Sequence, residues 1–226
     1  CEWDADRWFT DAEGAEELNG LRRLIGPKAL EASKDGVPAL LAAVEDSRKR
    51  QADLSNVLRE NVRQAVELLL EEVSAAHRTH PALFRELAAG PDGTSLHDAE
   101  AQEAMLQAGV RVVMRLVVCL FAESRKLLPV DDPIYAQSYG VRALYELLDS
   151  AARAEGGTRA LADRRMAWPR LMALFRLVHA GSAHGSFPVP AYGGALFRPG
   201  EDAHEDPVSR ALYLLEHAVP VRDEAI

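Results

Sequence analysis

The chain has few cysteines, the residues that form disulfides and bind zinc. Only two of its 226 residues are cysteine, Cys1 and Cys119, so neither a disulfide framework nor a cysteine-ligated zinc site is supported. A cytoplasmic location is therefore the plain expectation. We find no signal peptide and expect no membrane span, because charged residues interrupt the most apolar stretch. The first residue is Cys rather than Met, so we expect the chain to belong to a longer polypeptide.

Sequence motifs for catalysis and cofactor binding are also missing. We find no Gly-x-Gly-x-x-Gly, no phosphate-loop lysine signature and no His-Glu-x-x-His. His179, His184 and His204 gather along the chain, but surface or capping roles are favoured over metal ligation, because zinc requires a strict ligand set. Glu123 lies near Arg125, and an ion network on the helix surface is favoured over a catalytic acid. No catalytic, cofactor-binding or metal site is expected.

Composition narrows the class of protein further. The chain is 48 % hydrophobic and 27 % charged, which excludes a chain that is disordered throughout. Its net charge of −9 argues against a protein that binds nucleic acid over its whole surface, since phosphate binding needs clustered Lys and Arg. A local basic patch stays compatible with this charge.

The hydrophobic pattern is helical almost throughout. Between Ser95 and Pro129 lies the longest unbroken pattern, and from Met105 to Leu128 apolar residues wrap nearly the whole circumference, which predicts a buried central helix. We find no alternating strands of useful length. Further helices are expected over residues 38–50, 54–76, 135–152, 161–180 and 207–217, and an irregular loop, rich in Gly and Pro, over residues 185–200.

These patterns predict an all-α fold, an irregular multi-helix bundle around a long buried central helix, with a Gly/Pro-rich loop near the C-terminus. Residues 1–20 carry Trp3 and Trp8 among several acids and are expected to form a peripheral arm. Residues 21–226 are expected to form one helical domain. A subdivision of this domain near residues 90–94 stays open, because that stretch is rich in Gly and Pro.

Several segments resemble a family of bacterial DNA-modification enzymes. Residues 116–129, Leu-Val-Val-Cys-Leu-Phe-Ala-Glu-Ser-Arg-Lys-Leu-Leu-Pro, resemble a helix of the type Leu-Phe-Ala-Glu-Asp-Arg-Gly-Leu-Leu-Pro. Pro190 to Phe197 is similar to a later loop, Pro-Ala-Tyr-Asn-Gly-Gly-Leu-Phe, and residues 54–70, 135–148 and 168–177 are similar to helices of the same family in the same order. The family comprises adenine-specific DNA methyltransferases of type IIG restriction-modification and phage-growth-limitation (BREX-type) defence systems. Here Lys126 stands where the family has Gly, and Gly193 stands where it has Asn.

The resemblance covers about residues 21–226 and implies a helical connector upstream of a methyltransferase core. The motifs that bind S-adenosylmethionine and the flipped adenine do not occur here, so the connector itself is expected to be non-catalytic and to hold no cofactor. S-adenosylmethionine is expected in the parent enzyme. The expected partners are the adjacent methyltransferase domain and, through the parent enzyme, DNA, with no membrane.

Two sets of residues are candidates for contacts made by such a connector. Candidate contacts to the DNA backbone are Arg111, Arg115, Arg125 and Lys126, with residues 48–50 as another option, and ordinary salt bridges or helix-dipole contacts are the alternative for each. Tyr192, Gly193, Gly194 and Phe197 are candidates for an interdomain loop. The alternative for this loop is a turn in which the glycines adopt positive φ while the two aromatic residues are buried.

Two other classes of function stay open at this point. The first is an interaction module that recruits further defence-system subunits, which predicts an exposed apolar patch without a basic groove. The second is a stand-alone enzyme, which predicts a deep pocket where titratable groups converge around His179, His184 and Glu123.

Overall fold

The computed structural model describes residues 16, 18, 19, 26, 39–82, 85, 87, 98–154, 157–202 and 205–226. The chain divides into two compact units, residues 1–60 and 61–226. The division falls inside a helix. Most of the predicted arm, residues 1–20, and all of the predicted subdivision, residues 90–94, lie outside the described residues.

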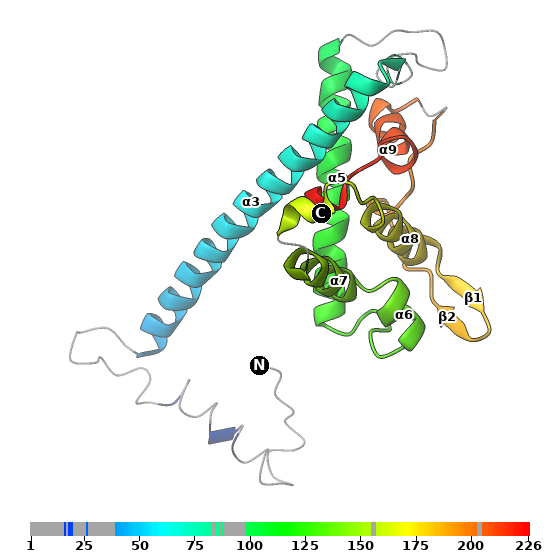
Figure 1. The fold of residues 1–226 in the computed structure, drawn as a ribbon. Helices are drawn as coiled ribbons and strands as arrows, with labels where there is room; N and C mark the ends of the chain where they lie inside the picture. The colour runs from blue at the N-terminus through cyan, green and yellow to red at the C-terminus, as the bar shows by residue number, and fades with distance from the viewer. Residues whose placement is uncertain are drawn as a thin grey trace. The chain divides into compact units, whose positions relative to one another are not determined.

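The described residues confirm the all-α fold class, since only two very short strands accompany the helices (Figure 1). The helices are α3 (Ala39–Thr79), α5 (Asp98–Ser124), α6 (Pro133–Ser138), α7 (Val141–Ala154), α8 (Ala167–Ala180) and α9 (Pro207–His217), with 3₁₀ turns η1 (Thr158–Leu161) and η2 (Asp223–Ala225). The strands β1 (Ser182–His184) and β2 (Phe187–Val189) form one antiparallel hairpin.

Helix α3 joins two segments that the sequence pattern had separated. It runs unbroken for 41 residues, where two helices were expected with a join near residues 51–53. The join is helical because the residues there include no Gly or Pro to end the first helix. In the second unit, Leu69, Val73 and Ala76 of α3 are buried.

Helix α5 is the centre of the second unit, and α9 and α7 pack against it (Figure 1). It ends five residues before Pro129, because Lys126 adopts a left-handed conformation with φ of 54°. The amide of Leu127 donates to the carbonyl of Ala122 over 2.9 Å, and that of Lys126 donates to Glu123 over 3.1 Å. This pair of hydrogen bonds is the Schellman termination, which favours Gly at the position of Lys126.

The burial of α5 is one-sided, which the sequence pattern alone did not indicate. Ala101, Ala108 and Cys119 are buried in the core, whereas Phe121 is 55 % exposed. By length and composition, residues 99–124 also form the one stretch in the described part of the chain that is apolar enough to cross a membrane, although core helices pass this test as well. Of the apolar window concerned, 44 % is buried inside the structure.

The loop expected over residues 185–200 is partly ordered into the hairpin. Ser182 pairs with Val189 and His184 with Phe187, so β2 lies inside the segment that was expected to be irregular. The hairpin is held by apolar contacts, since Phe187 is buried and stacks on Tyr139 with 5.7 Å between ring centroids. Helix α8 ends at Ala180, where the expected helix over residues 161–180 also ends, and Gly181 follows it with φ of 71°.

Two carboxylates attach the C-terminal segment to distant helices. The Asp223 side chain accepts a 2.8 Å hydrogen bond from the amide of Ala167, the first residue of α8, whose own N-cap residue Met166 provides no acceptor. The Glu72 carboxylate on α3 accepts hydrogen bonds from both the backbone and the side chain of Arg222. These contacts fix the position of the segment that follows α9.

The pair between Glu72 and Arg222 predicts a loss of stability in acid. Burial alone would raise the pKa of Glu72, but the hydrogen bonds and the charge of Arg222 outweigh it, so the pKa lies below its ordinary value. A lowered folded-state pKa contributes stability above the unfolded-state pKa, and this contribution is lost as the pH falls through the folded-state value. We therefore expect Glu72→Gln to cost about 1–3 kcal/mol at pH 7 and progressively less below about pH 4.

Urea unfolding from pH 7 to pH 3 measures this difference. Glu71→Gln changes the neighbouring, exposed carboxylate and is the matched control. A constant gap between wild type and Glu72→Gln over the whole pH range would contradict the assignment.

Candidate functional site

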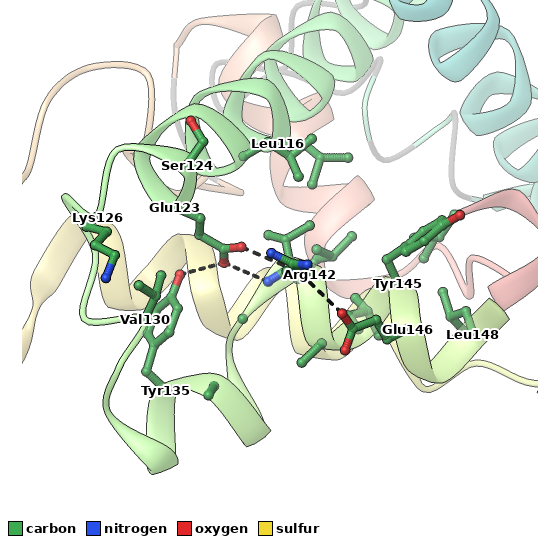
Figure 2. A pocket seen from close by; sticks show the side chains of 18 of the residues that line it. Leu116, Glu123, Ser124, Lys126, Val130, Tyr135, Arg142, Tyr145, Glu146 and Leu148 are labelled. Atoms are coloured by element: carbon green, nitrogen blue, oxygen red, sulfur yellow. Dashed lines mark hydrogen bonds and ion pairs between the residues drawn. The ribbon is translucent and has the colours of Figure 1, made fainter. Parts of the chain in front are cut away.

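A pocket of about 830 Å³ lies where the C-terminal end of α5 meets α6 and α7 (Figure 2). We call it the α5–α7 pocket, and its volume is within the range of small-molecule sites. Its lining is mostly apolar and includes Leu116, Leu120, Val130, Tyr135, Val141, Leu144, Leu148 and Leu171, with Glu123 among them. Tyr145 is 67 % exposed at this site.

Glu123 is the central polar residue of the α5–α7 pocket. Its carboxylate accepts hydrogen bonds from the hydroxyl of Tyr135 (2.8 Å) and from the amides of Val141 (2.7 Å) and Arg142 (3.2 Å). Those two amides begin α7, and the preceding residue, Gly140, has no side chain that could cap them. Glu123 therefore caps α7 from another helix, and the expected ion network with Arg125 is wrong.

The contacts of Glu123 limit the chemistry that it can perform. Its carboxylate accepts three hydrogen bonds at the N-terminal end of α7, so its oxygens are already engaged in structural contacts. Burial, together with the hydrogen bond to Glu123, raises the pKa of Tyr135 well above the ordinary value of a tyrosine. The Tyr135 hydroxyl is therefore not arranged to give up its proton near neutral pH. We assign both to the structure of the pocket.

The charged residues around the pocket pair with one another. Arg142 lies 3.2 Å from Glu146, and Lys126 lies 3.4 Å from Asp131, with all four side chains largely exposed. Exposed pairs of this kind contribute little to stability. The pocket thus offers an apolar surface with balanced charge at its edge.

Arg115, one of the predicted DNA contacts, is instead buried in the core of the second unit. Its side chain is 1 % exposed and lies 2.7 Å from Glu216 of α9, which is 4 % exposed. Its remaining donors reach the carbonyls of Leu196 (2.7 Å) and Arg198 (2.6 Å). Burial lowers the pKa of Arg115, and the ion pair with Glu216 opposes that effect. A phosphate has no access to this guanidinium, so the prediction for Arg115 is wrong and the intramolecular alternative holds.

The other predicted DNA contacts have different surroundings. Arg111 is half-buried, whereas Arg125 and Lys126 are exposed at the C-terminal end of α5. The guanidinium of Arg125 lies over the ring of Phe121, 5.5 Å from its centroid. Arg48 and Lys49 are exposed on α3 within the first unit, and the side chain of Arg50 lies outside the described residues. For these exposed cations, DNA contact stays a prediction.

The predicted interdomain loop is attached to the body of the second unit. The hydroxyl of Tyr192 donates a 2.6 Å hydrogen bond to the carbonyl of Leu127, and Phe197 is buried edge-to-face against Phe175. Gly193 and Gly194 have φ of 64° and 85°, and nothing lies within 4 Å of the position of an added Cβ on either. Within the described residues, these glycines therefore serve backbone conformation rather than a close approach. A contact with another domain stays a prediction.

The histidines that were weighed as metal ligands do not come together at the pocket, and surface or capping roles were favoured for them. His184 is exposed on the hairpin and its ring lies 2.8 Å from the hydroxyl of Ser186. His179 lies at the end of α8, and neither histidine lines the α5–α7 pocket. His204 lies outside the described residues. Among the residues that the structure describes, no group of three His, Cys, Asp or Glu side chains is placed to hold a metal ion.

Cys119, buried on α5 beside the pocket helices, is expected to be unreactive in the folded protein. Burial, aided by the charge of Glu123, raises the pKa of Cys119 to about 12. Because the thiolate is the reactive form, only about one thiol in ten thousand is ionised at pH 8. We expect iodoacetamide to alkylate Cys119 slowly under native conditions and rapidly in guanidinium chloride, as followed by mass spectrometry in Cys1→Ser. Equal rates in the two solvents would contradict the burial.

Comparison of the chain with known proteins returned no match among family models, curated proteins or solved structures.

Proposed function

We propose that this chain is a non-catalytic helical connector of a bacterial adenine-specific DNA-modification enzyme. One observation carries the proposal: the segments that resemble that family also contact one another. Glu123 in residues 116–129 accepts from Tyr135, which begins the next similar segment. Tyr192 of the similar loop donates to Leu127. Motifs that fold against one another form one mechanical unit, as a connector requires.

The buried polar contacts support a rigid body. Arg115 links α5, α9 and the loop that precedes α9, and Asp223 and Glu72 attach the C-terminal segment to α8 and α3. Buried ion pairs with satisfied hydrogen bonds hold one geometry in preference to others. In a connector, such rigidity fixes the distance between the parts at its ends.

The surroundings of the titratable groups argue against a stand-alone enzyme. That alternative requires His179, His184 and Glu123 to converge in a deep pocket. Glu123 is occupied as a helix cap, and the two histidines lie outside the α5–α7 pocket. Their separation removes the support for that alternative.

An interaction module for other defence-system subunits is the second candidate function. The largely apolar α5–α7 pocket, with the exposed ring of Tyr145, favours it. Apolar surface of this kind on a folded protein marks sites of contact with other proteins. The two candidates differ in what the parent polypeptide contains, because only the first requires a methyltransferase core.

The parent gene and its product test the proposed function. We expect the reading frame beyond Ile226 to encode an S-adenosylmethionine-binding core, and the full-length product to methylate adenine in DNA. The connector alone is expected to transfer no methyl group. A full-length product without that core, or methyl transfer by the connector alone, would refute the proposal.

A salt titration tests the contact between the connector and DNA. We expect Arg125→Ala/Lys126→Ala to reduce the slope of log affinity against log salt by about 2, because each lost phosphate contact removes about 1. Arg153→Ala removes an exposed arginine of α7 and is the matched control. An unchanged slope in the double variant would exclude these residues as contacts.

A further inference from the structure

The described part of the chain leaves an apolar row on the outer face of α5 partly exposed. We call it the α5 stripe, and it consists of Leu106, Val110, Met114, Val118 and Phe121. The first four are 37–39 % exposed and Phe121 is 55 % exposed. The opposite side of α5, with Ala101, Ala108 and Cys119, is buried. The stripe therefore lies opposite the core.

The centre of the stripe is nearly straight, and the stripe has a charge at each end. Val110, Met114 and Phe121 lie within about 40° of one another around the helix, whereas Leu106 and Val118 lie about 80° and 40° to either side of Met114. Glu103 lies eleven residues before Met114, and Arg125 lies eleven residues after it. Eleven residues are about three helical turns, so Glu103, Met114 and Arg125 lie on the same face.

This arrangement is complementary to itself when the helix is reversed. In an antiparallel pair with its two-fold axis at Met114, Val110 of one helix lies opposite Val118 of the other. Glu103 lies opposite Arg125, and the two-fold axis repeats this pair at the other end. A parallel pair would instead place like charges together. The geometry points to a second copy of this chain as the occupant of the α5 stripe, in an antiparallel, isologous dimer.

The charges at the two ends are held in suitable positions. The guanidinium of Arg125 lies over the ring of Phe121, 5.5 Å from its centroid, so it covers the end of the apolar row. The Glu103 carboxylate accepts a 2.8 Å hydrogen bond from Gln107, one turn further along α5. Charge pairs at the edge of an interface determine orientation and register more than affinity. Because the stripe is only partly exposed, we expect a dimer whose population depends on concentration.

This inference does not depend on the proposed function, since it uses only the pattern on α5. A lipid surface or a different protein could also cover an apolar row. Neither explains why an acidic residue, Glu103, and a basic residue, Arg125, lie at equal distances on either side of Met114. The experiments below distinguish these occupants.

Charge exchange tests the antiparallel register. Sedimentation equilibrium of the full chain is expected to show a monomer–dimer equilibrium. Glu103→Arg or Arg125→Glu alone should weaken the dimer at least about tenfold, because each creates two like-charge contacts, about 1.4 kcal/mol in total. The double exchange should restore the wild-type affinity. Gln102→Arg adds charge on another face of the same helix and should leave the dimer unchanged.

A cross-link tests the position of the two-fold axis. Two helices in contact place facing Cα atoms roughly 3.5–5.5 Å apart at the axis, which a disulfide can bridge. In a Cys1→Ser background, Met114→Cys should therefore oxidise to a covalent dimer. Leu106→Cys should not, because its symmetry mate lies about 24 Å away along the axis. Circular dichroism confirms that each variant is folded.

Three results would overturn the dimer. They are a monomer at all concentrations, a double exchange that does not restore association, and equal cross-linking at Leu106→Cys and Met114→Cys. Co-sedimentation of a monomer with anionic phospholipid vesicles, abolished by Met114→Glu, would assign the stripe to a lipid surface instead. Each of these results separates the dimer from the proposed connector role, which the methylation assay tests.

Discussion

Replacing Arg115 by methionine is expected to lower the free energy of unfolding by about 3–5 kcal/mol, because it leaves a buried charge without its partner. Glu216 is 4 % exposed and loses the guanidinium that lies 2.7 Å away. The carbonyls of Leu196 and Arg198 lose their donors at the same time. The ring of Phe175, 5.6 Å from the guanidinium, also loses a cation–π contact. Guanidinium chloride unfolding followed by circular dichroism measures the loss.

The controls for this prediction use the same residue type in other surroundings. Arg142→Met removes an arginine whose side chain is 86 % exposed and should cost less than about 0.5 kcal/mol. Arg115→Met/Glu216→Leu removes both charges and should recover about 1–3 kcal/mol relative to Arg115→Met. If Arg115→Met cost no more than Arg142→Met, the guanidinium would be in solvent and its earlier assignment to DNA would be open again.

Helical periodicity contained enough information to place Arg115 correctly. The buried residues Ala108 and Val112 lie seven and three residues before Arg115, and Cys119 lies four residues after it, which puts Arg115 on the core face of α5. The partner that makes this burial tolerable, Glu216, follows 101 residues later in the sequence. No local pattern relates the two residues. The sequence therefore shows that a charged residue occupies a core position of the helix. Only the fold shows which residue pairs with it.

The features predicted from sequence are those determined by neighbouring residues. The bounds of α9 and the end of α8 at Gly181 follow from local start and stop signals, Pro207 and a glycine with positive φ. The two remote caps could not be predicted in this way. Gly140 and Met166 provide no side-chain acceptor for the first amides of α7 and α8. The carboxylates that accept from these amides, Glu123 and Asp223, come from other parts of the chain.

The α5–α7 pocket was missed for a related reason. Its lining comes from α5, α6, α7 and α8, together with Ile226, and it forms only when these elements pack. One signal did point to Glu123. An acid in the last turn of a helix opposes that helix's dipole, so its position requires another explanation. The N-terminus of α7 provides that explanation.

The second large effect is expected at Glu123, where alanine should lower the free energy of unfolding by about 2–4 kcal/mol. The substitution removes the acceptor for two amides at the start of α7 and for the hydroxyl of Tyr135. Loss of an N-cap costs about 0.5–2 kcal/mol, and a buried hydroxyl without its charged partner adds about 1–3 kcal/mol. Since Gly140 has no side chain, no neighbouring group replaces the cap.

The effect of Glu123→Ala should be concentrated at one end of α7. Hydrogen exchange is expected to quicken at the amides of Val141 and Arg142, whereas those of α9 keep their wild-type rates in conditions where the protein stays folded. Tyr135→Phe removes only the hydroxyl and should cost about 1 kcal/mol, and Glu146→Ala, at an exposed pair, should cost almost nothing. If the first amides of α7 stayed protected from hydrogen exchange in Glu123→Ala, the Glu123 cap would not be needed to stabilise the helix. The carboxylate in the pocket would then be a candidate for binding a ligand, since its position would serve no structural purpose.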